Sequence, residues 1–259
     1  MLKRTQLQDL HYALFKRDFF TLLADLPPGL SRRIGKLNYG PETWDAYPKF
    51  EASDGQQLVF IHVPKCAGTS LARTFGFRSF RHLPASVLRL TNPEAFDRAA
   101  VFATVREPLS RLVSLINHFG HAPLAADRER EVYAELMEER GGLVGVVEGF
   151  VTDARVRDRM FRGTNAGRSG LMTSQHDYLY ARGERLVPNL FALKHLADME
   201  AWLSERLGEP VALKRKNTSR KPDGVTFPAE LRARVAAFFP EDQALYDEVM
   251  DRGGSIVAD

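Results

Sequence analysis

One segment of the sequence places a lysine, a glycine and two hydroxyl side chains directly after an apolar run. The run is Leu58–Val63, and the segment after it consists of Pro64, Lys65, Cys66, Ala67, Gly68, Thr69 and Ser70. A loop between a buried strand and a helix points its backbone N–H groups at one spot, where an anion can bind. Gly68 would let the backbone approach closely, and Lys65 would add a full charge. These residues predict a cradle for a phosphate or sulfate; on spacing alone, a turn that only caps a helix fits equally well.

A second segment repeats this arrangement around Arg106, which follows the apolar run Val101–Val105. An arginine at the carboxyl end of a strand can hold a phosphate through two parallel hydrogen bonds. Ser114 lies eight residues further on, about two turns into the expected helix, where it can face the same ligand. Arg111 either adds charge to this site or is a solvated or salt-bridged helix residue, and we favour the second interpretation.

Cys66 is the only cysteine of the chain. A single cysteine excludes an intrachain disulfide and a structural cysteine-rich zinc site, and it fits a reducing compartment. A thiol beside a helix N-terminus could be a nucleophile of low pKa, but no base accompanies it in the sequence, so a small loop residue is the preferred interpretation. The loop is also not a Walker A motif, in which lysine follows the second glycine, because Lys65 precedes Gly68.

The elements that must position these residues alternate between strand and helix. Three apolar runs predict strands buried on both faces, as in a parallel sheet: 58–63, 101–105 and 190–193. Helical spacing follows each of them, and Pro108 suits a first helical turn. Further helices are expected over 127–162 and 228–250. This order predicts an α/β fold with a central parallel sheet flanked by helices.

Composition bounds the class of protein. The 259 residues are 44% hydrophobic and 27% charged, which suits one large globular domain. Residues 1–56 are expected to form a helical and irregular extension that packs on a main domain, 57–259. A net charge of +3 and a pI of about 9.0 suit an anionic ligand, but no block of like charges suggests a nucleic-acid partner.

The hydropathy pattern gives an expectation for the cellular compartment of the protein. The first residues lack the continuous apolar stretch of a signal peptide, and no run of about 18 apolar residues predicts a transmembrane segment. An amphipathic helix on a membrane surface is an alternative for residues 5–25, although Asp9 and Asp18 lie on its polar face. With the single cysteine, these features predict a cytoplasmic protein.

The two anion-binding segments together resemble the signature of sulfotransferases that use 3′-phosphoadenosine-5′-phosphosulfate (PAPS), in particular the carbohydrate branch with the heparan 2-O-type enzymes and bacterial relatives. Phe60–Ser70 resembles the 5′-phosphosulfate loop, whose lysine sits beside the bridging oxygen of the leaving group. Phe102–Ser114 resembles the 3′-phosphate motif, whose arginine and serine map onto Arg106 and Ser114. The resemblance implies a P-loop-like three-layer fold, with PAPS as co-substrate, PAP as product and no metal.

Later segments extend this resemblance to roughly residues 57 to 250. They are a glutamine-containing segment, a basic loop near the nucleotide and a terminal helix, here Gln175–Leu179, Lys216–Ser219 and Phe239–Tyr246. The basic loop adds Lys216 and Asn217 to the implied nucleotide contacts. Where many relatives have an acidic residue after the third strand, this chain has Lys194 and His195, and the first 50 residues match no pattern of the family.

Transfer to a hydroxyl also needs a base, and seven histidines compete for that role. Carbohydrate members of the family place a catalytic histidine about two dozen residues before the 3′-phosphate arginine, and His82 lies 24 residues before Arg106. A loop residue without chemistry is the alternative for His82, and other branches of the family use a glutamate, for which Glu107 and Glu184 are candidates. His62 is expected to be a core residue, and His118 and His121 are expected at the surface.

The resemblance implies a sulfotransferase that moves a sulfonate group from PAPS to an acceptor hydroxyl, on a carbohydrate, by in-line displacement. His82 would be the base, and Lys65 would stabilise the leaving phosphate. Arg162, Arg168 and Arg182 either line a groove for an acidic glycan or are solvated. The alternatives are a non-catalytic protein that binds PAP or a glycan on the same scaffold, and a nucleotide-dependent phosphotransferase. The acceptor and the oligomeric state do not follow from the sequence.

Overall fold

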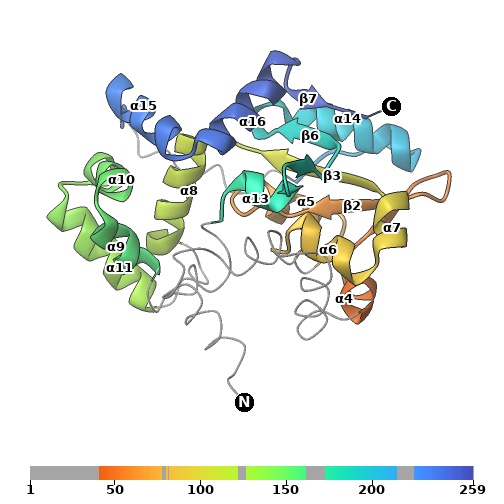
Figure 1. Cartoon of the computed structure of the whole chain (residues 1–259), viewed down its shortest axis with the longest axis horizontal. Coiled ribbons are helices and arrows are strands. Elements are labelled where there is room, and N and C mark those ends of the chain that lie inside the picture. The colour runs from red at the N-terminus through yellow and green to blue at the C-terminus, as the bar shows by residue number, and fades with distance from the viewer. Residues whose placement is uncertain are drawn as a thin grey trace.

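A five-stranded sheet forms the centre of the protein (Figure 1). The computed structural model describes residues 41–77, 80, 82–121, 127–161, 173–214 and 225–258. The sheet has the order β1-β2-β3-β6-β7, with strands β1 (Phe50–Glu51), β2 (Gln57–Ile61), β3 (Ala100–Val105), β6 (Asn189–Ala192) and β7 (Ser255–Ile256). Strands β2, β3 and β6 are parallel, in a register that pairs Phe60 with Phe102 and Phe102 with Asn189.

The predicted α/β class is confirmed, and the three predicted strands are the three parallel ones. The sheet as a whole is mixed, because both edge strands run antiparallel to their neighbours. Strand β1 reaches β2 through a short turn at Gly55, whose φ of 83° lies in the left-handed region, and so short a connection forces antiparallel pairing. Each edge strand has two residues, too few to leave a periodic signal in the sequence.

Helices fill the connections between the strands. Between β2 and β3 lie α5 (Gly68–Thr74), α6 (Ala85–Thr91) and α7 (Pro93–Arg98). Between β3 and β6 lie α8 (Pro108–His121), α9 (Asp127–Glu139), α10 (Leu143–Thr152), α11 (Ala154–Phe161), α13 (Gln175–Leu179) and the small hairpin of β4 (Tyr180–Ala181) and β5 (Glu184–Arg185). After β6 come η1 (Leu193–His195), α14 (Leu196–Leu207), α15 (Ala229–Phe238) and α16 (Pro240–Asp251).

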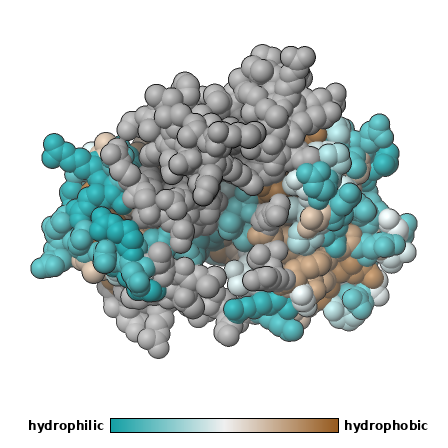
Figure 2. All heavy atoms as spheres, turned by 90° about the horizontal axis from the view of Figure 1, so that it is seen from below, coloured by the Kyte–Doolittle hydropathy of each residue, from teal (hydrophilic) through white to brown (hydrophobic). Residues whose placement is uncertain are grey.

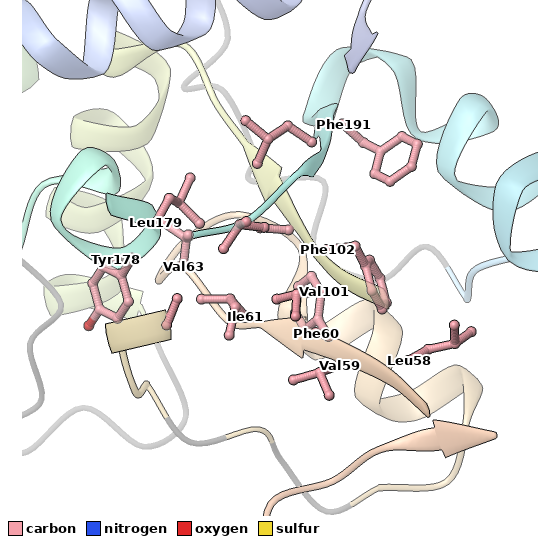
Figure 3. Packing of buried hydrophobic residues seen from close by; sticks show 14 of the residues in the cluster. Leu58, Val59, Phe60, Ile61, Val63, Val101, Phe102, Tyr178, Leu179 and Phe191 are labelled. Atoms are coloured by element: carbon pink, nitrogen blue, oxygen red, sulfur yellow. The ribbon is translucent and has the colours of Figure 1, made fainter. Parts of the chain in front are cut away.

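The central strands are buried on both faces, as their unbroken apolar runs predict. All six residues of β3 and all four of β6 are buried. The Trp202 ring of α14 lies 5.1 Å from the Phe102 ring and 5.6 Å from the Phe191 ring. Figure 3 shows Tyr178 and Leu179 of α13 packed into the same apolar cluster, beside Val63 at the end of β2. Helices therefore cover the sheet, in agreement with a layered arrangement.

A second apolar core lies outside the sheet, among α8, α9, α10, α11 and α15, at the left of Figure 1. One side of α8 packs into it with leucines, Ile116 and Phe119. The opposite side of α8 carries Ser110, Arg111 and Ser114, which lie within about one third of a helical turn of each other at 3.6 residues per turn. Helix α8 therefore separates the helical lobe from the polar ends of the strands. In Figure 2 the lobe side is mostly hydrophilic, and more hydrophobic atoms lie on the opposite side.

The described part of the N-terminal extension packs on the main sheet. Helix α4 (Pro41–Asp45) and β1 both precede residue 57. Trp44 and Phe50 belong to the sheet core, and the Tyr47 hydroxyl donates a hydrogen bond of 2.7 Å to the Phe60 carbonyl. The sheet thus begins ahead of the expected boundary at residue 57. The predicted helix at 5–25 lies outside the described residues.

Among the described residues, no helix is both long enough and apolar enough to cross a membrane.

Replacement of Phe102 by alanine tests the sheet core. We expect Phe102→Ala to lower the free energy of unfolding by about 3–5 kcal/mol, because a fully buried ring would leave a cavity between β2 and α14. Denaturant unfolding followed by circular dichroism measures the loss. Val257→Ala is the control, since Val257 is 46% exposed and its truncation should cost below about 0.5 kcal/mol. Equal losses in the two variants would contradict this description of the core.

Candidate functional site

The loop after β2 and the turn after β3 meet at one edge of the sheet. These strands are parallel neighbours, so their carboxyl ends lie side by side. The Arg106 guanidinium donates a hydrogen bond of 3.2 Å from Nη1 to the Lys65 carbonyl oxygen. The structure therefore brings together the two cationic residues that the sequence analysis singled out, 41 positions apart along the chain.

The backbone of the first loop turns through two left-handed residues, Lys65 with φ 68° and Ala67 with φ 63°. Non-glycine residues seldom adopt this conformation, and where they do they concentrate at functional sites. Alternation of right- and left-handed residues turns successive N–H groups toward one side and forms an anion-binding concavity. No described residue accepts a hydrogen bond from the N–H groups of Lys65, Ala67 or Gly68. Helix α5 has only seven residues, so the loop itself supplies most of the donors.

Gly68 is required for a reason that the sequence analysis did not give. A Cβ atom at Gly68 would lie 2.0 Å from Nε2 of His62, so the imidazole ring occupies the space that any other side chain would need. His62 is buried, with its Nδ1 3.3 Å from the Phe80 carbonyl oxygen. Burial, reinforced by His82, lowers the pKa of His62 to about 3, so the ring is neutral. The prediction of a core histidine is confirmed, and this histidine shapes the loop from beneath.

Lys65 and Arg106 concentrate positive charge at this edge of the sheet. Burial, together with the nearby charge of Arg106, lowers the pKa of Lys65 to about 8. The pKa of Arg106 is also lowered, first by burial. Within the described ranges, neither side chain forms an ion pair with an aspartate or glutamate. Two desolvated cations without a carboxylate partner are costly, and an anion bound between them would offset that cost.

The turn after β3 is held on both sides of Arg106. Arg106 Nε donates a hydrogen bond of 2.8 Å to Ser110 Oγ on the first turn of α8. Glu107 accepts a hydrogen bond of 2.9 Å from the Ser110 N–H, so its carboxylate caps the helix. Glu107 was a candidate base, and this bond assigns it a structural role in the described conformation.

Arg111 is buried and links the first loop to two other parts of the chain, so it is not a solvated residue. Its Nε donates to the Pro64 carbonyl oxygen at 3.1 Å, and its Nη2 donates to the Thr173 carbonyl oxygen at 2.7 Å. Its Nη1 lies 3.5 Å from Oδ2 of Asp242, with 8% and 1% of the two side chains exposed. The salt-bridged alternative is therefore confirmed, and the bridge holds the first loop against α16.

Cys66 does not have the environment of a nucleophile. It is buried, and burial raises the pKa of its thiol to about 11. The Sγ atom donates a hydrogen bond of 3.3 Å to Gln175 Oε1, and the Cys66 carbonyl accepts one from the Thr104 hydroxyl. The thiol is thus neutral at physiological pH, which supports a structural role in the loop.

His82 lies beside the loop, as a base would have to. Its ring centroid is 4.2 Å from that of His62, and its Nδ1 is 3.4 Å from the His62 carbonyl oxygen. If Nδ1 carries the proton and donates to that carbonyl, the Nε2 lone pair stays free to accept one. Burial, together with the charges of Lys65, Arg111 and His118, lowers the pKa of His82 to about 4. His82 is therefore neutral, the form that a base requires.

The other predicted site residues differ in their surroundings. Thr69 is exposed and Ser70 half-buried at the start of α5. Ser114 is 6% exposed on the polar side of α8. Glu184, the second candidate glutamate, is on β5, where its carboxylate is 69% exposed and 3.8 Å from Arg89. The residues Lys216, Asn217, Arg162 and Arg168 lie outside the described part of the chain.

Three residues around the site have an environment or contacts that were not predicted from the sequence. His118, expected at the surface, is half-buried, and burial and Lys65 lower its pKa to about 4. Its position four residues after Ser114 could have revealed it, because such residues share a helix face. Asp242 lies in the segment Phe239–Tyr246, which resembles the terminal helix of the family, but its contact with Arg111 is seen only in the folded chain. Gln175 was noted within a motif, but its contacts with Cys66 and Arg106 were not.

Within the described ranges, no group of three or more histidine, cysteine, aspartate or glutamate side chains could hold a metal ion. Comparisons of the chain with protein-family models, with curated proteins and with solved structures give no significant match.

Removal of one partner from the Arg111–Asp242 pair should destabilise the protein strongly. Arg111→Met leaves the Asp242 carboxylate buried without its cation, and we expect a loss of about 3–5 kcal/mol in the free energy of unfolding. Denaturant unfolding of Arg111→Met, Asp242→Leu and the double variant measures the coupling between the two residues. The double variant should lose less than the sum of the two single losses, by about 1–3 kcal/mol. Additive losses would mean that the two side chains act independently.

Proposed function

We propose that this protein is a PAPS-dependent O-sulfotransferase with a P-loop-like three-layer fold. The observation that carries the proposal is the contact of 3.2 Å between the Arg106 guanidinium and the Lys65 carbonyl. It supports the use of both turns on one ligand that has an anionic group at each end, as the 3′-phosphate and 5′-phosphosulfate of PAPS provide. In the described part of the chain the two cations have no carboxylate ion pair and the loop N–H groups of Lys65, Ala67 and Gly68 have no acceptor, so these groups can serve as the donors that such a ligand needs.

In the proposed reaction, the oxygen of an acceptor hydroxyl attacks the sulfur of PAPS in line with the bridging oxygen. A new S–O bond forms while the bond from sulfur to the bridging phosphate oxygen breaks, and PAP leaves with the electron pair. Lys65 stabilises the charge that develops on that oxygen. A preorganised donor at such a position is worth about 10²–10³-fold in rate. The remaining loop donors are the N–H groups of Lys65, Ala67 and Gly68 and the hydroxyl groups of Thr69 and Ser70. In this proposal Ser114, Lys216 and Asn217 complete the nucleotide site.

The acceptor proton passes to His82 in this proposal. Three observations support this assignment: the closeness of His82 to the loop through His62, its neutral form and its Nδ1 contact, which leaves Nε2 free. A positioned general base contributes about 10²–10⁴-fold. The proposed acceptor is a carbohydrate, because the motifs resemble the carbohydrate branch of the family, and the proposed location is the cytoplasm.

Binding of PAP tests the first half of the proposal. PAP at 100 times its dissociation constant should raise the free energy of unfolding by about 2.7 kcal/mol, visible as an increase in melting temperature. Lys65→Ala and Arg106→Ala should each weaken PAP binding at least tenfold, because each removes a cation from one anionic end. Isothermal titration calorimetry measures these affinities. If PAP does not bind the wild-type protein, the proposal fails.

Turnover tests the second half of the proposal. His82→Ala should keep its affinity for PAP and lose about 10²–10⁴-fold in rate, measured by mass spectrometry of glycans incubated with PAPS. A reaction that persists in EDTA separates sulfonate transfer from a Mg²⁺-dependent phosphotransferase. Full activity of His82→Ala would reject the base assignment, and PAP binding without any consumption of PAPS would indicate a non-catalytic binding protein.

The pH profile of kcat/KM gives an independent check, because it reports groups of the free enzyme. The rate should rise with pH near 4, as His82 loses the proton that blocks it from acting as a base. It should fall above about pH 8, as Lys65 loses its charge. Lys65→Arg should shift the alkaline limb to higher pH, since arginine stays charged. An unchanged alkaline limb in that variant would show that Lys65 does not set it.

A further inference from the structure

The Gln175 side chain joins the two anion-binding turns. Gln175 is the first residue of α13 and is 0% exposed. Its Oε1 accepts a hydrogen bond of 2.8 Å from the Arg106 N–H, and its Nε2 donates one of 2.7 Å to the Arg106 carbonyl. The same Oε1 accepts the Cys66 thiol hydrogen at 3.3 Å. One amide therefore contacts both the loop that carries Lys65 and the residue that forms the second turn.

The backbone of Arg106 has no partner in strand β6. The pairing of β3 with β6 ends at Val105, which pairs with Ala192. Both backbone hydrogen-bonding groups of Arg106 are then satisfied by Gln175, in the way that one more residue of a neighbouring strand would satisfy them. The direction in which the Arg106 side chain leaves the sheet thus depends on the position of Gln175.

Gln175 is itself fixed from two directions. The Ser174 hydroxyl accepts a hydrogen bond of 3.0 Å from the Asp177 N–H, which caps α13. The Asp242 carboxylate accepts one of 2.9 Å from the His176 N–H, and that carboxylate also faces Arg111. The amide is therefore held in place by groups that do not touch the proposed ligand themselves.

We infer that Gln175 is a positioning residue that sets the spacing between the two anion-binding turns, and thereby selects a nucleotide with two anionic ends over one with a single end. The inference rests on the proposed function. Two anions on one molecule gain affinity together only when both sites can be reached at once, so the gain depends on the distance between the sites. Loss of the Gln175 hydrogen bonds should therefore weaken the binding of a nucleotide with two anionic ends more than the binding of a nucleotide with one.

The test compares three ligands on the full chain by calorimetry: PAP, adenosine 5′-monophosphate and adenosine 3′-monophosphate. Gln175→Met removes the hydrogen bonds at similar volume. We expect its affinity for PAP to fall about tenfold or more, which corresponds to the loss of one or two net hydrogen bonds. Its affinity for each monophosphate should stay within about threefold of wild type.

Asn189→Leu is the matched control, because Asn189 is also a buried amide that binds backbone groups. It is 4% exposed, its Nδ2 donates to the Val101 carbonyl at 2.9 Å and its Oδ1 accepts from the Ala258 N–H at 3.1 Å. This variant should lose stability and keep the wild-type preference for PAP over the monophosphates. Gln175→Glu keeps the acceptor for the Arg106 N–H and loses the donor to the Arg106 carbonyl, so its preference for PAP should lie between those of the wild type and Gln175→Met. If Gln175→Met does not fold, a preference in Gln175→Glu as strong as that of the wild type overturns the inference.

The outcomes separate the two proposals. If the wild-type protein binds PAP no more tightly than the monophosphates, the proposed function fails and the inference falls with it. If the wild type prefers PAP and the Gln175 variants keep that preference, the inference alone is wrong. An equal loss of affinity for all three ligands, or a loss of preference in Asn189→Leu as well, would assign Gln175 a purely structural role and would also overturn it.

Discussion

The repulsion between two desolvated cations at adjacent strand ends is the constraint on which the site depends. The Arg106 guanidinium donates a hydrogen bond to the Lys65 carbonyl, and the pKa of Lys65 is lowered first by burial and then by the charge of Arg106. A chain selected for stability alone would place a carboxylate there or leave the cations in water. The other contacts of the fold hold the two cations in this position, where, under the proposed function, a bound anion would stabilise them.

The residues around this site divide into those that face the expected ligand and those that hold them. Arg111 and Gln175 bind backbone groups of the two turns, and Asp242 binds Arg111 and the His176 N–H of α13. All three side chains are buried. Buried polar groups whose hydrogen bonds are satisfied make their surroundings rigid. His62 also restricts the loop, because its ring occupies the space next to Gly68 that a side chain would need. The loop conformation, with two left-handed residues, is therefore imposed by neighbours from four different parts of the chain.

The central strands and the helices after them could be predicted from the sequence, because burial on both faces requires continuous apolar runs and these are local features. The approach of Lys65 to Arg106 could also be predicted, since parallel neighbouring strands end at the same edge. The edge strands could not, because two residues show no periodicity. The contacts that give Gln175, Asp242 and Arg111 their roles could not be predicted either, because they span 47 to 131 positions. The packing also shows what the sequence could not, that the His62 ring leaves no space for a side chain at position 68.

The Arg111–Asp242 bridge also has a consequence for the order in which the chain is assembled during synthesis. Its partners are 131 residues apart, so at about 5–20 residues per second the ribosome needs roughly 7 to 26 seconds to make the second after the first. Throughout that interval the nascent β2 loop lacks the brace from α16, however early the strand itself forms. The edge that carries Lys65 and Arg106 is thus among the last regions to mature, and premature termination before α16 would leave it unfinished.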